Sequence, residues 1–204
     1  MLIRLPGRTI DGDTLLFLFA KHLVPTGSVV GTSMSNGALA SALQSMGRPF
    51  FRAAVGDREV YEMMLAKSSE LGGEQSGHII FRSADFGEQR TGDGSMTALA
   101  FLKVLAESYG ESIGSLVKDI PRPFPQKLVN IRVTEKRPWE EDAVLSAAVS
   151  AARSSLGPEG RLIIRYSGTE PLIRLMAESP NADAVHGQLA FLEERFRARL
   201  GSHD

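Results

Sequence analysis

Pro121-Arg122-Pro123-Phe124-Pro125 separates two different patterns of helices and strands in this 204-residue sequence. Proline lacks a backbone N–H and fixes φ, so three prolines in five residues fit neither a helix interior nor a hydrogen-bonded strand. We therefore predict a domain boundary at this segment. The fold class on each side follows from the order of the expected elements.

Strands and helices alternate on the N-terminal side of the boundary. The expected strands span residues 1–5, 28–32, 49–54 and 78–82, and the expected helices span residues 13–23, 36–46, 57–67 and 94–109. This alternation predicts a layered α/β domain with a largely parallel sheet, which we place over residues 11–120. A glycine-rich turn is expected at Gly72 and Gly73. Residues 1–10 begin with an apolar strand that has no earlier partner, so we assign them to the remnant of a preceding domain.

The order of elements changes on the C-terminal side. The expected elements are a strand over 127–133, a helix over 140–156, strands over 161–165 and 172–177, and a helix over 182–200. Strand, helix, strand, strand, helix is the order of a small α+β domain with an antiparallel sheet and both helices on one face. We place this second domain over residues 121–204.

The composition argues against several classes of protein. A hydrophobic content of 43% and a charged content of 23% support a folded core, and a net charge of -1 provides no field that would attract nucleic acid or a membrane. The absence of cysteine excludes disulfides, thiolate catalysis and cysteine zinc sites. No apolar run approaches the roughly 20 residues of a spanning helix. We expect a cytoplasmic protein that binds neither nucleic acid nor membranes.

The loop between the strands at 161–165 and 172–177 has the composition of a phosphate site. The candidate phosphate-binding residues are Arg165, Ser167, Gly168, Thr169 and Arg174. Arginine presents a planar donor fork to phosphate, and backbone amides in a turn add partial positive charge. The alternative is an ordinary hairpin loop in which the arginines pair with Glu170 or Glu178.

The segment from Leu71 to His78 is a second candidate site. Glu74, Ser76 and His78 stand among glycines, so a carboxylate, a hydroxyl and an imidazole can converge on a polyol such as a sugar. A solvated turn before a strand explains the same composition. His78 taken alone fits a structural histidine.

Carboxylates near expected helix starts are interpreted as caps rather than metal ligands. Asp11, Asp13 and Asp93 precede apolar helical patterns, where a side-chain oxygen can accept from free backbone N–H groups. Asp57 and Arg58 lie at another helix start, and a solvated ion pair between them is the alternative to a binding role. We predict no metal site in this chain.

Taken together, these segments resemble the phosphohexomutase family. The family's sugar loop, Gly-Glu-x-Ser-Gly-His, matches residues 73–78, and its phosphate loop matches residues 165–174. Further segments resemble the phosphoglucosamine mutase type in particular, and they span residues 55–58, 72–78, 91–94 and 125–130. The motifs follow in the family's order across essentially the whole chain.

The resemblance implies the C-terminal half of a four-domain enzyme that interconverts glucosamine 6-phosphate and glucosamine 1-phosphate. Such an enzyme works through a bisphosphorylated sugar, with a phosphoserine and Mg²⁺. On this match Glu74 and Ser76 hold sugar hydroxyls, and His78, Asp57 and Arg58 belong to the same substrate site. The arginines and the loop at 165–174 grip the phosphate that is not transferred.

The sequence also departs from the family. It contains neither a Thr-Ala-Ser-His-Asn-Pro type segment, which carries the serine, nor an Asp-Gly-Asp-x-Asp-Arg metal loop. We therefore expect no catalytic residue and no cofactor in this chain, and no turnover by the chain alone. Its expected partners are a phosphorylated hexosamine and a separate N-terminal mutase half. The alternative is a standalone phosphosugar-binding or regulatory module without catalysis.

Overall fold

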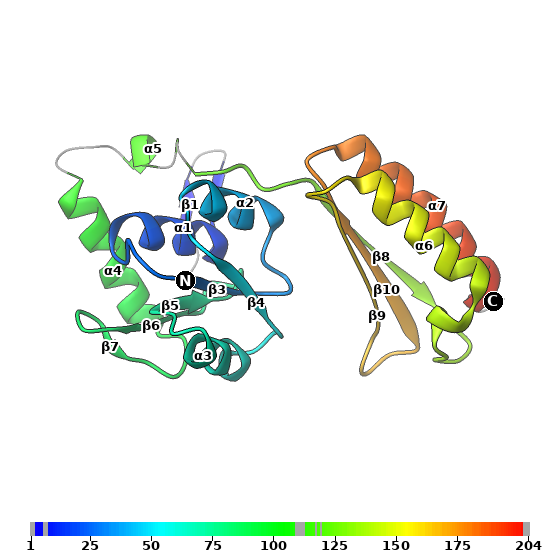
Figure 1. The fold of residues 1–204 in the computed structure, drawn as a ribbon, viewed down its shortest axis with the longest axis horizontal. Coiled ribbons are helices and arrows are strands. Elements are labelled where there is room, and N and C mark those ends of the chain that lie inside the picture. The colour runs from blue at the N-terminus through cyan, green and yellow to red at the C-terminus, as the bar shows by residue number, and fades with distance from the viewer. Residues whose placement is uncertain (1–2, 6–7, 109–112, 117, 119, 202–204) are drawn as a thin grey trace. The chain divides into compact units, whose positions relative to one another are not determined.

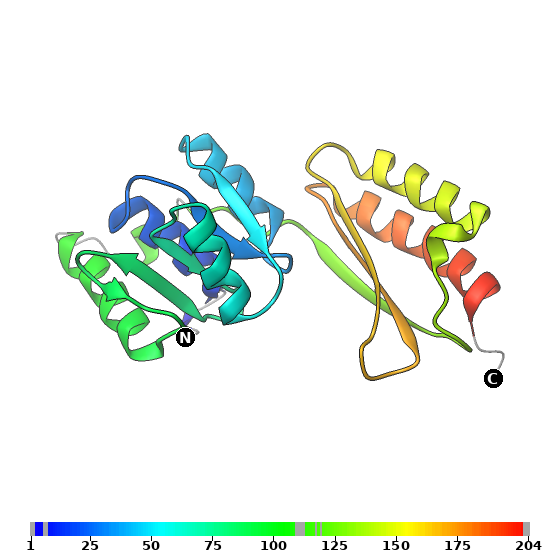
Figure 2. The ribbon, with the colours of Figure 1, turned by 60° about the horizontal axis from the view of Figure 1, so that its bottom comes forward.

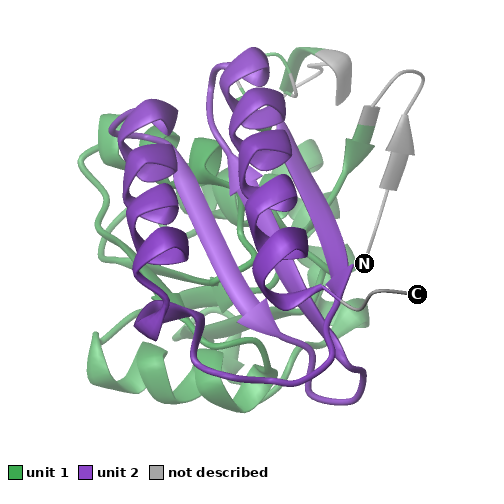
Figure 3. Ribbon diagram, turned by 90° about the vertical axis from the view of Figure 1, so that its right-hand side faces the viewer, with its two compact units in different colours: residues 1–123 green, residues 124–204 purple. Residues whose placement is uncertain are grey.

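The computed structural model describes residues 3–5, 8–108, 113–116, 118 and 120–201. The chain forms two compact units, residues 1–123 and residues 124–204 (Figure 3). Each unit has its own hydrophobic core, and we describe each by itself. Within the described residues, no helix combines the length and the apolar character needed to cross a membrane.

The first unit contains a five-stranded sheet with the strand order β4-β3-β5-β6-β7. Its strands are β3 (Val29–Thr32), β4 (Phe50–Ala53), β5 (Leu71–Gly73), β6 (Ile79–Ser83) and β7 (Gly87–Glu88). Its helices are α1 (Gly12–His22), α2 (Gly37–Ser45), α3 (Asp57–Ala66), α4 (Gly94–Glu107) and α5 (Ile113–Leu116). The layered α/β class expected for this region is confirmed.

Helices cover both faces of this sheet, as Figure 1 shows for α1 and α3. Successive strand residues point to opposite faces, so Val29 packs into the core beneath α1, α2 and α4, whereas Val30 packs against α3. In β6, Phe81 joins the first of these cores and Ile80 joins the second. The strands therefore carry continuous apolar runs, because both of their faces are buried.

The sheet is mixed rather than largely parallel, which corrects the expectation. Strand β3 runs parallel to β4 and β5, but β6 is antiparallel to both β5 and β7. The predicted turn at Gly72 and Gly73 is also wrong, since both residues belong to β5. A Cβ on Gly72 would lie 2.5 Å from Met64 Sδ, and one on Gly73 would lie 2.5 Å from the carbonyl oxygen of His78. These glycines are strand residues packed too closely for a side chain.

Side-chain caps begin three helices, two of them at the predicted residues Asp11 and Asp93. The side chains of Asp11, Asn36 and Asp93 accept hydrogen bonds from backbone N–H groups in the first turns of α1, α2 and α4. Each bond satisfies a donor that has no partner within its own helix. Asp13 is different, because its carboxylate accepts from the backbone N–H of Asn36, 2.7 Å away, and not from its own helix.

Residues near the N-terminus form a small antiparallel hairpin of β1 (Ile3–Leu5) and β2 (Arg8–Ile10). The strand expected to begin the chain therefore pairs with the residues that follow it. Its assignment to a preceding domain stays a prediction. Residues 1–2 of that expected strand, and residue 109 at the expected end of α4, lie outside the described residues.

The second unit is a three-stranded antiparallel sheet covered on one face by two long helices (Figures 1 and 2). Its elements are β8 (Gln126–Arg132), a short 3-10 helix (Trp139–Glu141), α6 (Ala143–Leu156), β9 (Arg161–Tyr166), β10 (Leu172–Glu178) and α7 (Ala182–Leu200). Strand β10 lies between β8 and β9. The predicted α+β class, with an antiparallel sheet and both helices on one face, is confirmed.

Candidate functional site

The loop between β5 and β6 is closed by its own backbone. The N–H of Glu74 donates to the carbonyl of His78 at 2.8 Å, and the N–H of Gly77 donates to the carbonyl of Glu74 at 2.9 Å. Gly77 has a φ of 99°, a conformation that favours glycine. The start of α1 supports the loop from outside, because the N–H of Gly12 donates to the carbonyl of Gln75 at 3.0 Å. The loop is thus held in one shape before any ligand binds.

The Glu74 carboxylate is oriented by one backbone donor and one side-chain donor. Oε1 accepts from the backbone N–H of Gly56 at 2.7 Å, and Oε2 accepts from the Ser76 hydroxyl at 3.1 Å. The Glu74 side chain is 13% exposed, so it keeps a small opening to solvent. A carboxylate has about four lone-pair sites, which leaves about two for the hydroxyls of a ligand.

Asp57 and His78 meet beside Glu74, although they lie 21 positions apart in the sequence. Nδ1 of His78 lies 3.0 Å from Asp57 Oδ1, and Asp57 Oδ2 accepts from the hydroxyl of Thr91 and from the N–H of Gly92. Burial acts to raise the pKa of Asp57, but the hydrogen bonds from Thr91, Gly92 and His78 outweigh it and hold that pKa below its ordinary value. Asp57 is therefore an anion that orients the half-exposed imidazole.

Arg58 does not join this group in the described structure. Its side chain is 82% exposed and pairs with Glu62 one helical turn later, at 2.8 Å. The ion pair considered between Asp57 and Arg58 is therefore replaced by two separate pairs, Asp57 with His78 and Arg58 with Glu62. The helix start points the two neighbouring side chains in different directions, as residues i and i+1 on a helix do not face each other.

Asp57, Glu74 and His78 place one ligand atom each within 4.8 Å of one another. That spacing suits a metal ion, but both carboxylates already accept from N–H and hydroxyl donors. The cluster has the hydrogen-bonding groups of a polyol site. The prediction that the chain carries no metal site stays a prediction.

The candidate phosphate loop connects β9 and β10 in the second unit. Arg165 and Arg174 are direct partners in adjacent antiparallel strands. Ile173 and Leu175 point into the core with α6 and α7, so the alternation of the strand places Arg174, and with it Arg165, on the opposite face. The two guanidinium groups therefore arise from neighbouring positions on the face without helices.

Only one weak ion pair engages these two arginines in the described structure. Nη2 of Arg174 lies 3.4 Å from Glu170, whose side chain is 57% exposed, and no described residue accepts from its buried Nε. Glu178, the other pairing partner considered, binds Arg161 instead at 3.2 Å. Of the pairs that the hairpin alternative expected, the described structure contains one, the long contact between Arg174 and the exposed Glu170. The Arg174 side chain is 34% exposed, so its outer N–H groups can donate to an acceptor from outside the chain.

Ser167 fixes the shape of the phosphate loop through its backbone and side chain. Its N–H donates to the carbonyl of Leu172 at 2.8 Å, and its hydroxyl oxygen accepts from the N–H of Glu170 at 3.3 Å. Ser167 is buried, whereas Gly168 and Thr169 are exposed. The loop therefore presents the backbone and hydroxyl of its tip to solvent.

Two further polar residues lie in this region, and neither is among the predicted site residues, although Asn130 ends the family-like segment 125–130. Asn130 of β8 is the direct partner of Arg174 on the other side of β10, on the same face. Lys136 donates from Nζ to the carbonyl of Ser167 at 2.6 Å. The segment 125–130 pointed to Asn130 only as part of a motif, and the strand register places it beside Arg174. Lys136 lies in no motif, and only the folded chain brings it to Ser167.

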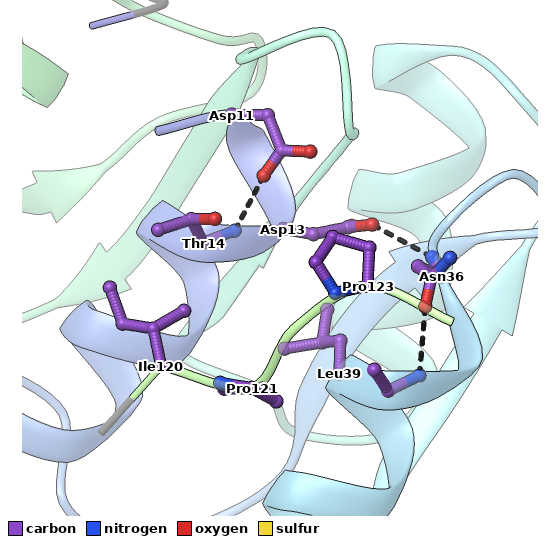
Figure 4. Close-up of a pocket in the computed structure, with 9 residues that line it drawn as sticks. Asp11, Asp13, Thr14, Asn36, Leu39, Ile120, Pro121 and Pro123 are labelled. Atoms are coloured by element: carbon purple, nitrogen blue, oxygen red, sulfur yellow. Dashed lines mark hydrogen bonds between the residues drawn. The ribbon is translucent and has the colours of Figure 1, made fainter. Parts of the chain in front are cut away.

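A small cavity of about 20 Å³ lies at the start of α1, apart from the sugar loop. Figure 4 shows the Asp13 carboxylate turned toward Asn36 beside Pro123. Burial raises the pKa of Asp13 to about 6, and the charge of Asp11 adds to this, while the Asn36 N–H, Ser35 and Arg52 oppose it. Asp13 is a buried group that changes charge close to neutral pH.

We expect Asp13→Asn to change the pH dependence of stability. The folded-state pKa lies above the ordinary value of 3.8, so the stability that Asp13 contributes is full below about pH 4 and is lost as the pH rises through about 6. The asparagine lacks this titration and keeps an oxygen that can accept from Asn36. Relative to wild type, the variant should gain about 2–3 kcal/mol in unfolding free energy between about pH 4 and about pH 7.5.

Urea unfolding at both pH values measures this difference. Asp93→Asn is the matched control, because Asp93 is an exposed cap and asparagine caps a helix equally well. A difference between Asp13→Asn and wild type that is the same at both pH values would show that Asp13 does not titrate in this range.

Family models match both units of the chain. The model described as "Phosphoglucomutase/phosphomannomutase, alpha/beta/alpha domain III" matches residues 11–124, and the model of the C-terminal domain of the same proteins matches residues 128–195. Together they cover the sheet with helices on both faces and the smaller antiparallel sheet.

Curated phosphoglucosamine mutases are similar over nearly the whole chain. The enzyme of Koribacter versatilis is 40% identical over 200 residues, which cover 96% of this chain and 42% of that protein. The enzyme of a Marinomonas species is 43% identical over 188 residues, which cover 90% of this chain and 41% of that protein. The chain thus spans less than half the length of these relatives.

Solved structures share the fold at lower sequence identity. The N-acetylphosphoglucosamine mutase of Aspergillus fumigatus superposes with a TM-score of 0.73 at 19% identity, covering 96% of this chain and 44% of that one. A phosphoglucomutase/phosphomannomutase family protein of Burkholderia thailandensis gives a TM-score of 0.68 at 20% identity, covering 94% and 42%.

Proposed function

The chain belongs to the phosphoglucomutase/phosphomannomutase family, and on that premise we propose that it is the substrate-binding half of a phosphoglucosamine mutase. The observation that carries the proposal is the arginine pair at the phosphate loop. Arg165 and Arg174 are cross-strand partners, and both are open to solvent, with one 3.4 Å contact from Arg174 to Glu170 among the described residues. A phosphate could accept from the outer N–H groups of both arginines.

The substrate we propose is a phosphorylated hexosamine. Its phosphate would be held by Arg165, Arg174, the Ser167 hydroxyl, the Thr169 hydroxyl and the N–H of Gly168. Its hydroxyls would bind Glu74, Ser76 and His78, with Asp57 orienting the imidazole. Arg58 is exposed and pairs with Glu62, so it would have to leave Glu62 to reach a ligand. The preference for an amino sugar rests on the similarity to phosphoglucosamine mutases.

A mutase that works through a bisphosphorylated sugar must hold its intermediate while the two phosphates exchange roles. Binding one phosphate and the sugar hydroxyls at fixed places keeps the intermediate from diffusing away. The residues of this chain are suited to that part of the reaction. They hold and orient the ligand, and none of them is proposed to carry the transferred phosphoryl group.

Mg²⁺ supplies charge neutralisation to phosphoryl transfer in mutases of this type. The residues here do not fit it, since Mg²⁺ prefers oxygen ligands and Asp57, Glu74 and His78 include an imidazole. Their carboxylates also already accept hydrogen bonds.

Binding without turnover is the expected behaviour of the purified 204-residue chain. Titration calorimetry should show binding of glucosamine 6-phosphate, because both loops are formed by the chain's own hydrogen bonds. A coupled assay should show no glucosamine 1-phosphate with or without Mg²⁺, because no phosphoryl donor is present in these residues. Mass spectrometry must exclude a contaminating host mutase.

Mixing the chain with the N-terminal half of a phosphoglucosamine mutase relative separates the two functional hypotheses. Turnover on mixing supports the half-mutase. Binding that never leads to turnover favours the standalone phosphosugar-binding or regulatory module. Absence of any phosphosugar binding by the chain and by the mixture contradicts both.

A further inference from the structure

Lys136 contacts the phosphate loop from a segment that follows β8. Its Nζ donates to the carbonyl oxygen of Ser167 at 2.6 Å. Ser167 also donates its N–H to Leu172 and accepts at its hydroxyl from Glu170. Lys136 therefore engages the remaining polar backbone group of the residue that fixes the loop.

The bond to Lys136 determines the direction of a neighbouring donor. The carbonyl of Ser167 and the N–H of Gly168 belong to the same peptide group, which is trans. In a planar trans peptide the C=O and N–H bonds point in opposite directions. A cation that holds the carbonyl of Ser167 on one side therefore directs the N–H of Gly168 to the other side.

The N–H of Gly168 is available to a ligand. No described residue accepts a hydrogen bond from it, and an added Cβ at Gly168 would meet nothing within 4 Å. An anion can therefore approach this donor without moving the protein. The positive charge of Lys136 at the carbonyl end polarises the peptide, which strengthens the N–H as a donor.

The position of Lys136 is set by contacts on the next residue. The carbonyl of Arg137 accepts from the Tyr166 hydroxyl at 2.5 Å, and the Arg137 guanidinium donates to the carbonyl of Arg199 at 2.9 Å. The segment that carries Lys136 is thus fastened both to the end of β9 and to the last turn of α7.

We infer that Lys136 is a positioning residue of the phosphate loop, which orients the Ser167–Gly168 peptide so that the Gly168 N–H donates to a bound phosphate. This inference rests on the proposed function, because it assigns a further residue to the same anion site. Lys136 acts through the peptide and does not itself contact the phosphate.

The test compares Lys136→Met, Lys136→Arg and Lys127→Met. Methionine keeps the length of the side chain without a donor, and arginine keeps a cationic donor. Lys127 is an exposed lysine of β8, so its variant loses the same charge without touching the loop. Calorimetry with glucosamine 6-phosphate measures binding, and the thermal midpoint of each variant checks that it is folded.

Lys136→Met should weaken binding about 5- to 15-fold. This loss of affinity corresponds to one hydrogen bond to a charged group, reduced because the site is partly exposed to solvent. Lys136→Arg should recover affinity to within about 3-fold of wild type, and Lys127→Met should stay within about 2-fold. The amide resonance of Gly168, measured without ligand, should shift in Lys136→Met and not in Lys127→Met.

The two proposals fail in different ways. If Arg174→Ala loses affinity while Lys136→Met binds as wild type, the inference about Lys136 is overturned and the phosphate site stands. Equal losses in Lys136→Met and Lys127→Met, or no recovery in Lys136→Arg, also overturn it. If wild type binds no phosphosugar, the proposed function fails. In that case, a Gly168 amide resonance that does not shift in Lys136→Met also contradicts the inference that Lys136 orients the Ser167–Gly168 peptide.

Discussion

Arg48→Met is expected to lower the unfolding free energy of the first unit by about 3–5 kcal/mol. Arg48 is 5% exposed and donates to the carbonyls of Ala20, Val24, Thr26 and Gly27, at distances between 2.5 and 2.7 Å. Helix α1 ends within this stretch, where carbonyl groups have no partner in their own helix. Methionine fills part of the volume but leaves these acceptors without a donor.

Urea unfolding with a probe in each unit measures this effect. The transition of the first unit should move to lower urea, while the transition of the second should stay in place. Arg90→Met is the matched control, because Arg90 is an exposed arginine of the same unit. An Arg48 variant as stable as Arg90→Met would show that water or a backbone shift replaces the guanidinium.

Arg174→Ala should weaken the binding of glucosamine 6-phosphate about 10- to 100-fold, and Arg165→Ala should act in the same direction. A charge-assisted hydrogen bond to phosphate contributes roughly 1.5–3 kcal/mol in a partly desolvated site. The effect on folding should be small, since neither side chain belongs to the apolar core of the second unit. Titration calorimetry measures the affinity, and circular dichroism confirms the fold.

Glu74→Ala provides the contrast that assigns each loop to its part of the ligand. It should weaken glucosamine 6-phosphate binding and leave the weak binding of inorganic phosphate nearly unchanged, whereas Arg174→Ala should weaken both. Arg153→Ala, an exposed arginine on α6, is the control for lost charge. Arginine variants that are folded and bind as wild type would leave the loop as an ordinary hairpin.

The sequence determined those features that depend on neighbours in the chain. Asp11, Asn36 and Asp93 cap helices because a short polar side chain reaches N–H groups only two or three residues away. The apolar runs and their spacing also predicted both fold classes, because the periodicity of a helix or a strand is a pattern among residues close together in the chain. The phosphate and sugar loops were also visible as compositions, since each is a continuous segment.

Tertiary structure alone decided which groups from distant segments meet. Glycine is common in turns, so the sequence favours a turn at Gly72 and Gly73, but both lie in β5, where Met64 and the His78 backbone leave no room for a side chain. Asp57 pairs with His78 rather than with Arg58, because a helix start directs adjacent side chains apart while the sheet brings β6 alongside. No local preference encodes such a choice.

The partners of two cationic side chains, Arg48 and Lys136, could likewise not be predicted from the sequence. Arg48 belongs to none of the motifs that the sequence showed, and its four carbonyl partners come from a segment more than 20 residues earlier. Lys136 reaches Ser167 across 31 positions. A charged residue in a sequence shows only that it needs a partner or solvent, and the partner is determined by the folded path of the backbone.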